Sequence, residues 1–423
     1  MLRAPGMAAR PGLDAVVVGA ARTAVGAFLG ALATVPAVAL GATAIRAVLL
    51  RAGTTRHLSP PYPHGPVGYT GAVDECIMGN VLGAGVGQAP ARQAALAAGL
   101  APSTVCTTVN KVCASGLKAV AMACQSIQLG QARVAVAGGM ESMSRAPYYL
   151  DAAARRGLPL GGVAGACTAL RDGILCDGLW DPTYQAHMGT CAEHVARAHG
   201  IGRAEQDAHA RESYARALRA IHTGQAAPEI APVSVGTGTG TDTSLYAVDE
   251  ECARADFDKM PRLRPVFDRE HGTITAANAS SLGDGAAAVL LMEAGAALAL
   301  GARPLARVLA YADAETDPRD FALAPALAVP KALARCGLAV RDVALFEINE
   351  AFSAVVRVNE RLLGLDPATV NVAGGAVALG HPLGASGCRI LVTLLHRLQP
   401  GQIGVAAVCN GGGGATAMVL ERL

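Results

Sequence analysis

The chain has 423 residues, of which 52% are hydrophobic and 16% are charged. This composition excludes a disordered protein and predicts a large core, with room for two halves that each bury apolar side chains. The 35 basic residues are nearly balanced by 33 acidic ones, and no apolar run of the sequence reaches the length of a membrane span. We therefore expect neither a nucleic acid nor a membrane as a partner.

Eleven cysteines occur without a C-x-x-C pair or regular spacing, which is typical of reduced thiols in a reducing compartment. Residues 1–13 are predicted to form an N-terminal tail. Arg3 and Arg10 give this tail a positive charge without any acidic residue, which is the charge character of a mitochondrial targeting segment. A mitochondrial location is therefore expected, with the cytoplasm as the alternative.

Strand and helix patterns alternate along the first part of the chain. Residues 15–20 predict a buried strand, residues 40–51 a helix, residues 74–80 a second strand and residues 91–100 a second helix. The proline-rich residues 54–70 predict a surface loop, because neither a helix nor a central strand accommodates so many prolines. Such alternation predicts an α/β fold with mostly parallel sheets that carry helices on both faces.

Cys113 lies between a β-branched, strand-like run and an alanine-rich run whose apolar residues recur at helical spacing. A thiol at the start of a helix faces the positive end of the helix dipole, so we expect the pKa of Cys113 to be depressed. The small residues 114–116 would let a substrate approach the thiol closely. An apolar strand predicted at residues 133–137 closes a strand–helix–strand unit around the cysteine.

An internal repeat relates the stretch around Cys113 to a stretch near the C-terminus. When Cys113 is aligned with Gly384, the Ala-Ser-Gly that follows it meets the Ala-Ser-Gly at residues 385–387. Without any gap, Lys118 then meets Arg389, and the next strand aligns as well. We therefore predict two homologous halves related by a pseudo-twofold axis.

The change in composition between these two stretches predicts an inserted lobe that covers the site. The predicted division is a tail at 1–13, an N-terminal half at 14–140 with part of its sheet at 260–295, an inserted loop domain at 141–259, and a C-terminal half at 296–423.

Two further candidate reactive groups lie in the second half. His381 is flanked by glycines and followed by Pro382, which predicts a loop position, although a lone loop histidine is more often solvated than catalytic. Cys409 follows an apolar strand and precedes Asn410 and four glycines, whose bare N–H groups can bind an anion. A nucleophilic thiol needs a base within hydrogen-bond reach, and a second thiol can exchange a carbon-bound proton.

At these residues the chain resembles the thiolase family. The resemblance covers roughly residues 14–423. Its motifs occur in the family's order: NKVCASG at 110–116, AGGMESMS at 137–144, HMGTCAE at 187–193, NASSLGDGAA at 278–287, NEAFS at 349–353, GGAVALGHPLGASG at 374–387 and CNGGGG at 409–414. The resemblance implies thiolase-like duplicated βαβαβ halves that form a five-layer α-β-α-β-α core, with an inserted loop domain.

The resemblance also implies a reaction, the reversible ping-pong Claisen condensation of two acetyl-CoA molecules to acetoacetyl-CoA and CoA. Cys113 would attack acetyl-CoA with His381 as its base and would carry the acetyl group as a thioester. Cys409 would then remove an α-proton from the second acetyl-CoA. His381 and a water held by Asn349 would form one oxyanion hole, and the backbone N–H groups of Cys113 and Gly411 would form the other.

Positions that match the family's ligand contacts are also present, and Arg254 and Lys259 among them suit nucleotide phosphates. The implied CoA contacts are Tyr214, Arg254, Ala255, Asp256, Lys259, Ser280, His187 and Met188. A potassium ion, which activates some members, would bind at Tyr214, Ala276, Ala277, Ala279 and Val377. No covalent cofactor is implied, and the expected assembly is a homotetramer built as a dimer of dimers. The chain departs from the potassium-activated members at Ala322, where they have proline after phenylalanine.

Two alternatives stay open at this point. One is a longer-chain 3-ketoacyl-CoA thiolase of β-oxidation, and the other is an acyl-CoA- or lipid-binding protein without catalytic activity. The presence of Cys113, His381 and Cys409 together favours an enzyme. The exact residues of the motifs around both cysteines favour the reaction with short acyl chains over that with longer 3-ketoacyl-CoA substrates.

Overall fold

The computed structural model describes residues 14–52, 73–150, 152, 170–236 and 243–423. The tail predicted at 1–13 and the proline-rich loop predicted at 54–70 both lie outside these described residues. In the described part of the chain, no helix is both long enough and apolar enough to cross a membrane.

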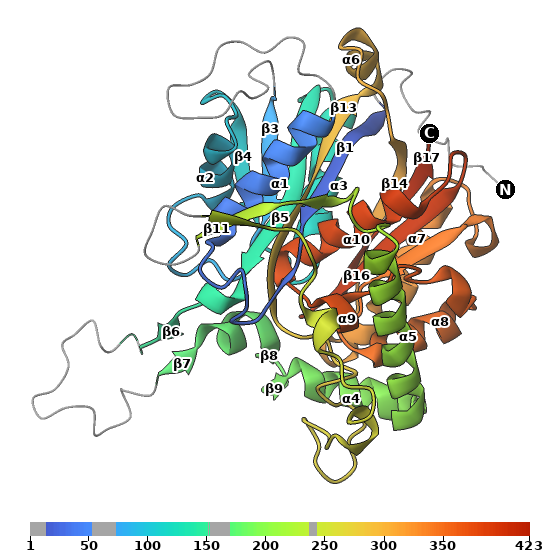
Figure 1. Cartoon of the computed structure of the whole chain (residues 1–423). Helices are drawn as coiled ribbons and strands as arrows, with labels where there is room; N and C mark the ends of the chain where they lie inside the picture. Colours follow the sequence, from blue (N-terminus) through green and yellow to red (C-terminus); the bar gives the residue numbers. More distant parts are fainter. Residues whose placement is uncertain (1–13, 53–72, 151, 153–169, 237–242) are drawn as a thin grey trace, which may run out of the picture.

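One large mixed sheet of eleven strands runs through the molecule (Figure 1). Its main path is β4-β3-β5-β13-β1 in the first half and β14-β17-β16-β15 in the second. The bounds are β1 Ala15–Thr23, β3 Glu75–Gly79, β4 Val105–Val109, β5 Val134–Ser142, β13 Gly283–Glu293, β14 Ala306–Glu315, β15 Leu345–Ile348, β16 Ile403–Asn410 and β17 Gly414–Arg422. The short strands β2 (Gly26–Ala27) and β10 (Ile230–Ala231) pair at the side of this path.

The two halves of the sheet repeat one pairing pattern. In the first half β3 is parallel to β5, and β5–β13 and β13–β1 are antiparallel. In the second half β15 is parallel to β16, and β16–β17 and β17–β14 are antiparallel. The halves join where Val16 and Val17 of β1 pair with β14. This agreement is what the internal repeat predicts.

The prediction of mostly parallel sheets is wrong, because most of the long strand pairs are antiparallel. A tight hairpin joins β16 to β17 through residues 411–413, and a short connection of this kind permits only antiparallel pairing. In the first half, β13 returns from the inserted region and lies antiparallel between β5 and β1. Strands that are buried on both faces have similar apolar sequences whether they run parallel or antiparallel, so the sequence did not indicate their direction.

Helices and sheet halves form five layers, as predicted (Figure 1). Helices α3 (Ser115–Gln128) and α10 (Leu383–Arg397) pack together in the central layer, between the two halves of the sheet. Helices α1 (Ala37–Arg51) and α2 (Pro90–Ala97) cover the outer face of the first half. Helices α7 (Ala324–Arg335) and α8 (Ser353–Leu363) cover the outer face of the second.

The remaining elements belong largely to the region predicted as an insertion. The helices are α4 (Met188–Ala198), α5 (Arg203–His222), α6 (Ala294–Ala299) and α9 (Ala376–Leu379). The short strands are β6 (Tyr148–Tyr149), β7 (Arg171–Asp172), β8 (Trp180–Asp181), β9 (Ala186–His187), β11 (Val233–Gly236) and β12 (Thr243–Tyr246). Helix α5 packs against α9 and α8, so this region contacts the second half beside the site.

Glycines let the two central helices approach each other closely. A Cβ at Gly116 of α3 would lie 2.9 Å from Gly384 O, and a Cβ at Gly387 of α10 would lie 2.7 Å from Leu117 N. Gly116 and Gly387 are equivalent positions of the internal repeat. The crossing therefore brings the start of α3, which follows Cys113, against the start of α10.

Candidate active site

Cys113 lies on a strained turn between β4 and α3. Its neighbour Val112 has a φ of 46°, a left-handed backbone conformation that β-branched residues rarely adopt. Val112 N–H donates to Asn110 Oδ1 (2.9 Å), and Lys111 N–H donates to Ser115 Oγ (2.8 Å). The Ser115 hydroxyl in turn donates to Val112 O (2.6 Å). These bonds hold the turn so that Cys113 lines a cavity while only 9% of the residue is exposed.

His381 lies in the turn between α9 and α10 and lines the same cavity. It is in a loop, as predicted, but it is only 5% exposed and so is not a solvated histidine. The Ser386 hydroxyl donates to Pro382 O (2.9 Å), so Ser386 Oγ accepts the hydrogen of His381 Nδ1 at 2.6 Å. We assign the tautomer from this network, and it leaves Nε2 of His381 free to accept a proton.

Asn349 follows β15 and is completely buried. Its backbone N–H donates to Ala407 O of β16 (2.9 Å), and its side-chain Nδ2 lies 3.4 Å from His381 Nε2. Its Oδ1 has no hydrogen-bond partner among the described residues. Because a buried polar atom without a partner is unfavourable, this oxygen is suited to bind a water molecule.

The turn between β16 and β17 brings the second half to Cys113. Gly411 lines the cavity, and its backbone N–H lies close enough to the Cys113 thiol to act against the rise in its pKa. Cys409 lies two residues earlier, near the end of β16, and is completely buried. Burial and, secondly, the nearby Cys113 raise the pKa of Cys409, so the two thiols lie within electrostatic reach of each other.

The cavity itself has a volume of about 310 Å³. Of the residues predicted from the sequence, it is lined by Cys113, His381, Gly411, His187, Met188, Ser280 and Ala279. Cys409 and Asn349 do not line it. Its wall is mainly apolar, with three phenylalanines at positions 267, 321 and 352. Such a cavity favours a small apolar group next to the thiol.

The other predicted CoA contacts do not line this cavity. Arg254, Ala255, Asp256 and Lys259 lie along a segment with two 3-10 helices, Glu251–Arg254 and Met260–Arg262. Arg254 and Lys259 are both exposed, and Arg254 pairs with Glu250. Tyr214 on α5 is buried and packs edge-on against Phe257 of this segment, with the ring centroids 6.0 Å apart.

Three of the five predicted potassium ligands, Tyr214, Ala277 and Val377, pack in one cluster. Of the other two, Ala279 lines the cavity and Ala276 is exposed. Burial raises the pKa of Tyr214, and the carboxylates of Glu251 and Glu350 raise it further. A phenol oxygen with negative charge nearby is a suitable neighbour for a hard cation.

The predicted low pKa of Cys113 is wrong. Burial raises the pKa of the Cys113 thiol to about 12, although the N–H groups of Gly411 and of Cys113 itself act in the opposite direction. The buried carboxyl of Glu141 raises it further. The sequence shows that a helix begins here but not how deeply the thiol is buried, and desolvation exceeds the effect of the local N–H groups.

His381 is neutral for the same reason. Burial, with a contribution from the positive charge of Arg389, lowers the pKa of His381 to about 3. The cavity therefore holds a neutral thiol and a neutral imidazole rather than an ion pair. A neutral imidazole can take the thiol proton as the sulfur attacks a substrate.

Sequence reasoning missed Ser386 and Glu141 as supporting residues. Glu141 is completely buried at the end of β5, and its carboxylate accepts hydrogen bonds from Val81 N–H (3.0 Å) and from Gly384 N–H (2.9 Å). It thereby ties the first half to the start of α10. The internal repeat could have indicated Ser386, because Ser386 aligns with Ser115, whose hydroxyl stabilises the turn that carries Cys113.

Comparisons with known proteins agree with this geometry. Residues 15–295 match the family model "Thiolase, N-terminal domain", and residues 302–422 match "Thiolase, C-terminal domain". The mouse protein named "Acetyl-CoA acetyltransferase, mitochondrial" is 50% identical over 417 residues, covering 98% of this chain and 93% of the mouse chain. The human protein of the same name is 48% identical over 410 residues, covering 97% of this chain and 91% of its own.

A solved structure supports the same assignment. The crystal structure of a thiolase from Ascaris suum in complex with coenzyme A superposes with a TM-score of 0.87 at 42% sequence identity. The match covers 97% of this chain and 100% of that one. From the two family models, the relatives and this shared fold, the chain belongs to the thiolase family.

Proposed function

We propose that this chain is an acetyl-CoA C-acetyltransferase, which reversibly condenses two acetyl-CoA molecules to acetoacetyl-CoA and CoA. The observation that carries the proposal is the meeting of Cys113, His381 and the Gly411 N–H at one small apolar cavity. The names of the mouse and human relatives support the same reaction. A purely binding protein would not need a buried thiol, a neutral imidazole and a donor N–H at one point.

The first half-reaction transfers an acetyl group to Cys113. The thiol proton moves to His381 Nε2 as Sγ attacks the thioester carbonyl. The N–H groups of Cys113 and Gly411, which act on the sulfur at rest, would donate to the carbonyl oxygen as it becomes an oxyanion. CoA leaves as its sulfur takes the proton from His381. One such donor typically contributes about 3 kcal/mol to the transition state.

The second half-reaction forms the carbon–carbon bond. The Cys409 sulfur, in its thiolate form, removes an α-proton from a second acetyl-CoA, and the resulting carbanion attacks the acetyl thioester on Cys113. A water held on Asn349 Oδ1 stabilises the enolate oxygen, since that amide oxygen has no other partner among the described residues. Collapse of the adduct breaks its bond to the Cys113 sulfur and releases acetoacetyl-CoA, and the Cys409 thiol gives its proton to the Cys113 thiolate.

CoA is a substrate and product here rather than a bound cofactor. The Ascaris suum relative is described in complex with coenzyme A. In this chain Ser280, His187 and Met188 line the cavity and would hold the reactive end of CoA. The exposed Arg254 and Lys259, with Ala255, Asp256 and Tyr214 beside them, would meet its nucleotide end.

A potassium ion would bind between α5 and α9. Tyr214 would supply its hydroxyl, and Ala276, Ala277, Ala279 and Val377 would supply carbonyl oxygens, with the negative charge of Glu251 nearby. If the ion is used, replacing potassium by sodium weakens CoA binding and lowers activity. Equal activity and equal CoA affinity in both salts would exclude this site.

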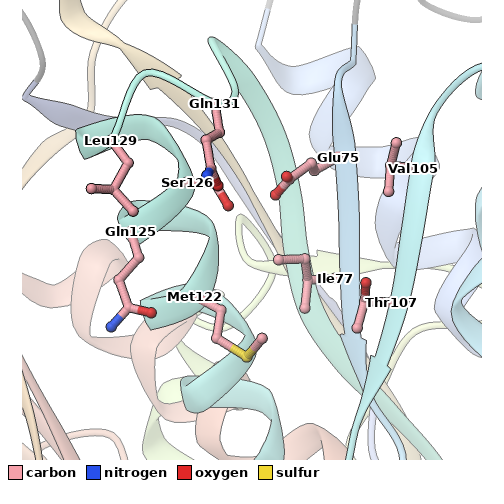
Figure 2. A pocket seen from close by; sticks show the side chains of 9 residues that line it. All are labelled: Glu75, Ile77, Val105, Thr107, Met122, Gln125, Ser126, Leu129 and Gln131. Carbon is pink, nitrogen blue, oxygen red and sulfur yellow. The ribbon is translucent and has the colours of Figure 1, made fainter.

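The proposed assembly is a homotetramer, and β4 supports a contact between copies. β4 ends the sheet, so its outer edge has unpaired N–H and C=O groups. Val105 of β4 and Leu129 after α3 are 62% and 71% exposed, and they flank a groove of about 280 Å³ (Figure 2). Light scattering should give a mass above the 42.6 kDa of one chain, and Val105→Lys should lower it. A monomeric wild type would contradict the proposal.

The proposed location is the mitochondrion, which the names of the relatives support. Imaging of the full chain with a C-terminal fluorescent tag tests this, and a diffuse cytoplasmic signal would contradict it.

A series of 3-ketoacyl-CoA substrates tests the proposed reaction. We expect the highest kcat/KM for cleavage of acetoacetyl-CoA, with a steep fall as the chain lengthens, because the cavity beside Cys113 is small and closed by phenylalanines. A maximum at medium or long chains would instead assign the chain as a longer-chain 3-ketoacyl-CoA thiolase. Absence of cleavage at every length would point to a binding protein.

A further inference from the structure

Two cysteines outside the active site face each other on neighbouring strands. Cys76 of β3 and Cys106 of β4 are direct partners in the parallel register of these strands. Neighbouring strands lie about 4.8 Å apart, which is within the Cα separation that a disulfide bridges. Both residues are free thiols in this structure, and neither lines the catalytic cavity.

Both side chains lie on the sheet face that α2 covers. Cys76 is completely buried there, and Cys106 is half-buried. Figure 2 shows the opposite face, where Val105 and Thr107 line the groove beside α3. Because side chains alternate along a strand, Cys106 points away from that groove and from the contact between copies proposed above.

A fixed cation lies next to Cys106. Nη1 of Arg92, on α2, is 3.9 Å from Cys106 Sγ. The same guanidinium donates to Thr104 O (2.7 Å) and to Pro102 O (2.6 Å), so it cannot swing away without losing both bonds. A rigid positive charge beside a half-buried thiol is the environment of a reactive cysteine.

The two thiols also affect each other. The neighbouring Cys76 thiol, and then the contact with Arg92, lowers the pKa of Cys106 below that of an ordinary thiol. The neighbouring Cys106, together with burial, raises the pKa of Cys76. One member of the pair is therefore the better nucleophile, and the other keeps its proton.

We propose that Cys76 and Cys106 form a hydroperoxide-reactive dithiol site, in which Cys106 is oxidised first and Cys76 resolves the product as a disulfide. The Cys106 thiolate attacks one oxygen of hydrogen peroxide, the O–O bond breaks, and hydroxide leaves with cysteine sulfenic acid formed. The Cys76 sulfur then attacks the Cys106 sulfur, and water leaves as the disulfide forms. The peroxide is reduced by two electrons, and the two thiols supply them.

The remaining cysteines supply a matched control. Cys336, at the end of α7, is partly exposed like Cys106. Its Sγ donates to the carbonyls of Ala332 and Leu333, no hydrogen bond joins it to a cation among the described residues, and burial raises its pKa. We therefore expect hydrogen peroxide to modify Cys106 well before Cys336.

The experiment treats the reduced full chain with a small excess of hydrogen peroxide, blocks the remaining thiols and maps peptides by mass spectrometry without reduction. We expect a peptide pair joined through Cys76 and Cys106, lighter by two hydrogen atoms and separated again by dithiothreitol. In Cys76→Ala we expect Cys106 sulfenic acid, trapped by dimedone, and no joined pair. In Cys106→Ala we expect Cys76 to stay reduced.

The charge requirement is tested separately. Arg92→Met should slow the modification of Cys106 by roughly tenfold, corresponding to a rise of about one pKa unit, and Arg92→Lys should retain most of the rate. A thermal melt confirms that each variant is folded. The proposal is overturned if folded wild-type protein modifies Cys106 no faster than Cys336, or if oxidised Cys106 accumulates without joining Cys76.

Discussion

The Cys113 thiol and the His381 imidazole, which we propose as catalytic groups, are both uncharged at rest because both are buried. The pKa of Cys113 is raised to about 12 and that of His381 is lowered to about 3, and desolvation is the largest cause of each shift. An ion pair would need two charges in a nearly dry cavity. The Ser386 hydroxyl instead fixes the neutral tautomer whose Nε2 can accept the proton.

The pH dependence of alkylation tests this neutral resting state. With iodoacetamide, modification of Cys113 should keep accelerating as the pH rises past 9.0, the ordinary value for a thiol, because burial raises its pKa. The measurement is the alkylation rate of the Cys113 peptide at a series of pH values. A plateau reached already at neutral pH would mean that a thiolate–imidazolium pair exists at rest.

Glu350, the neighbour of Asn349, gives a second prediction at this scale. Its buried carboxylate pairs with His209 at 3.1 Å and accepts hydrogen bonds from Ser213 and Asn371. Despite burial, these partners lower the pKa of Glu350 from 4.5 to about 2. The folded state thus holds the ionised form more tightly than the unfolded state does, and this stabilisation is present above pH 4.5 and is lost as the pH falls toward 2.

Between pH 4.5 and pH 2 we expect the free energy of unfolding of wild type to fall by about 3 kcal/mol more than that of Glu350→Gln. Urea unfolding of both proteins at each pH measures the difference. The control is Glu270→Gln, which changes a carboxylate that is 86% exposed. Parallel stability curves for wild type and Glu350→Gln would show that the native state gains nothing from the charge.

At the scale of elements, the crossing of α3 and α10 joins the two halves. The helices meet at equivalent glycines of the repeat, and a side chain at either one would press on backbone atoms of the other helix. Rigid contact here places the start of α10, with His381 just before it, against the turn that carries Cys113.

Gly116→Ala and Gly387→Ala should each destabilise the fold by about 1–3 kcal/mol. The new Cβ atoms would lie 2.9 Å and 2.7 Å from backbone atoms of the facing helix, which must therefore move. Both should also lower the rate of Cys113 acetylation. Gly202→Ala is the matched control, since nothing lies within 4 Å of its Cβ position. Thermal melts and acetylation rates compare the three, and equal values for all of them would contradict a tight crossing.

The elements themselves were predictable to different degrees. The helix over residues 40–51 is α1, which begins three residues earlier after Pro36, and the strand over 15–20 is β1, which continues to Thr23. Strand direction could not be predicted, because a strand buried on both faces is apolar throughout, whether its neighbours are parallel or antiparallel. The internal repeat carried most of the information, since it predicted two homologous halves related by a pseudo-twofold axis, and the two halves of the sheet do repeat one pairing pattern.

At the residue level the motifs predicted several groups that lie together in the structure, while the environment of those groups could not be predicted. Cys113, His381 and Gly411 line one cavity, but the pKa of Cys113 is raised where a helix start predicted a depressed value. Burial arises from contacts between residues far apart in sequence. The roles of Cys409 and Asn349 and the outer CoA contacts stay predictions.

At the scale of the whole molecule, a buried ion pair ties the inserted region to the sheet. Arg22 of β1 forms two hydrogen bonds with Asp249, at 2.7 Å and 2.8 Å, and its Nε lies 3.3 Å from Glu229. All three side chains are at most 2% exposed. The predicted division at residues 141–259 places both carboxylates in the insertion, so the lobe is anchored through charge as well as through apolar contacts.

Asp249→Asn should therefore destabilise the protein by about 3–5 kcal/mol, because it leaves the buried Arg22 guanidinium with only one carboxylate. Denaturant unfolding measures this loss. Asp342→Asn, at an exposed position on the second half, serves as the control and should stay within about 0.5 kcal/mol of wild type. Similar midpoints for both variants would show that the ion pair does not anchor the insertion.

The central claim is that the two halves supply different groups to one reaction, with Cys113 as acyl carrier and Cys409 as proton acceptor. The most direct test incubates wild type and Cys409→Ala with acetyl-CoA and follows two products, the acetylated peptide by mass spectrometry and acetoacetyl-CoA by absorbance. We expect one acetyl group on Cys113 in both proteins, and condensation slower by roughly a hundredfold or more in the variant. An acetyl group on another residue, or unimpaired condensation by Cys409→Ala, would contradict the claim.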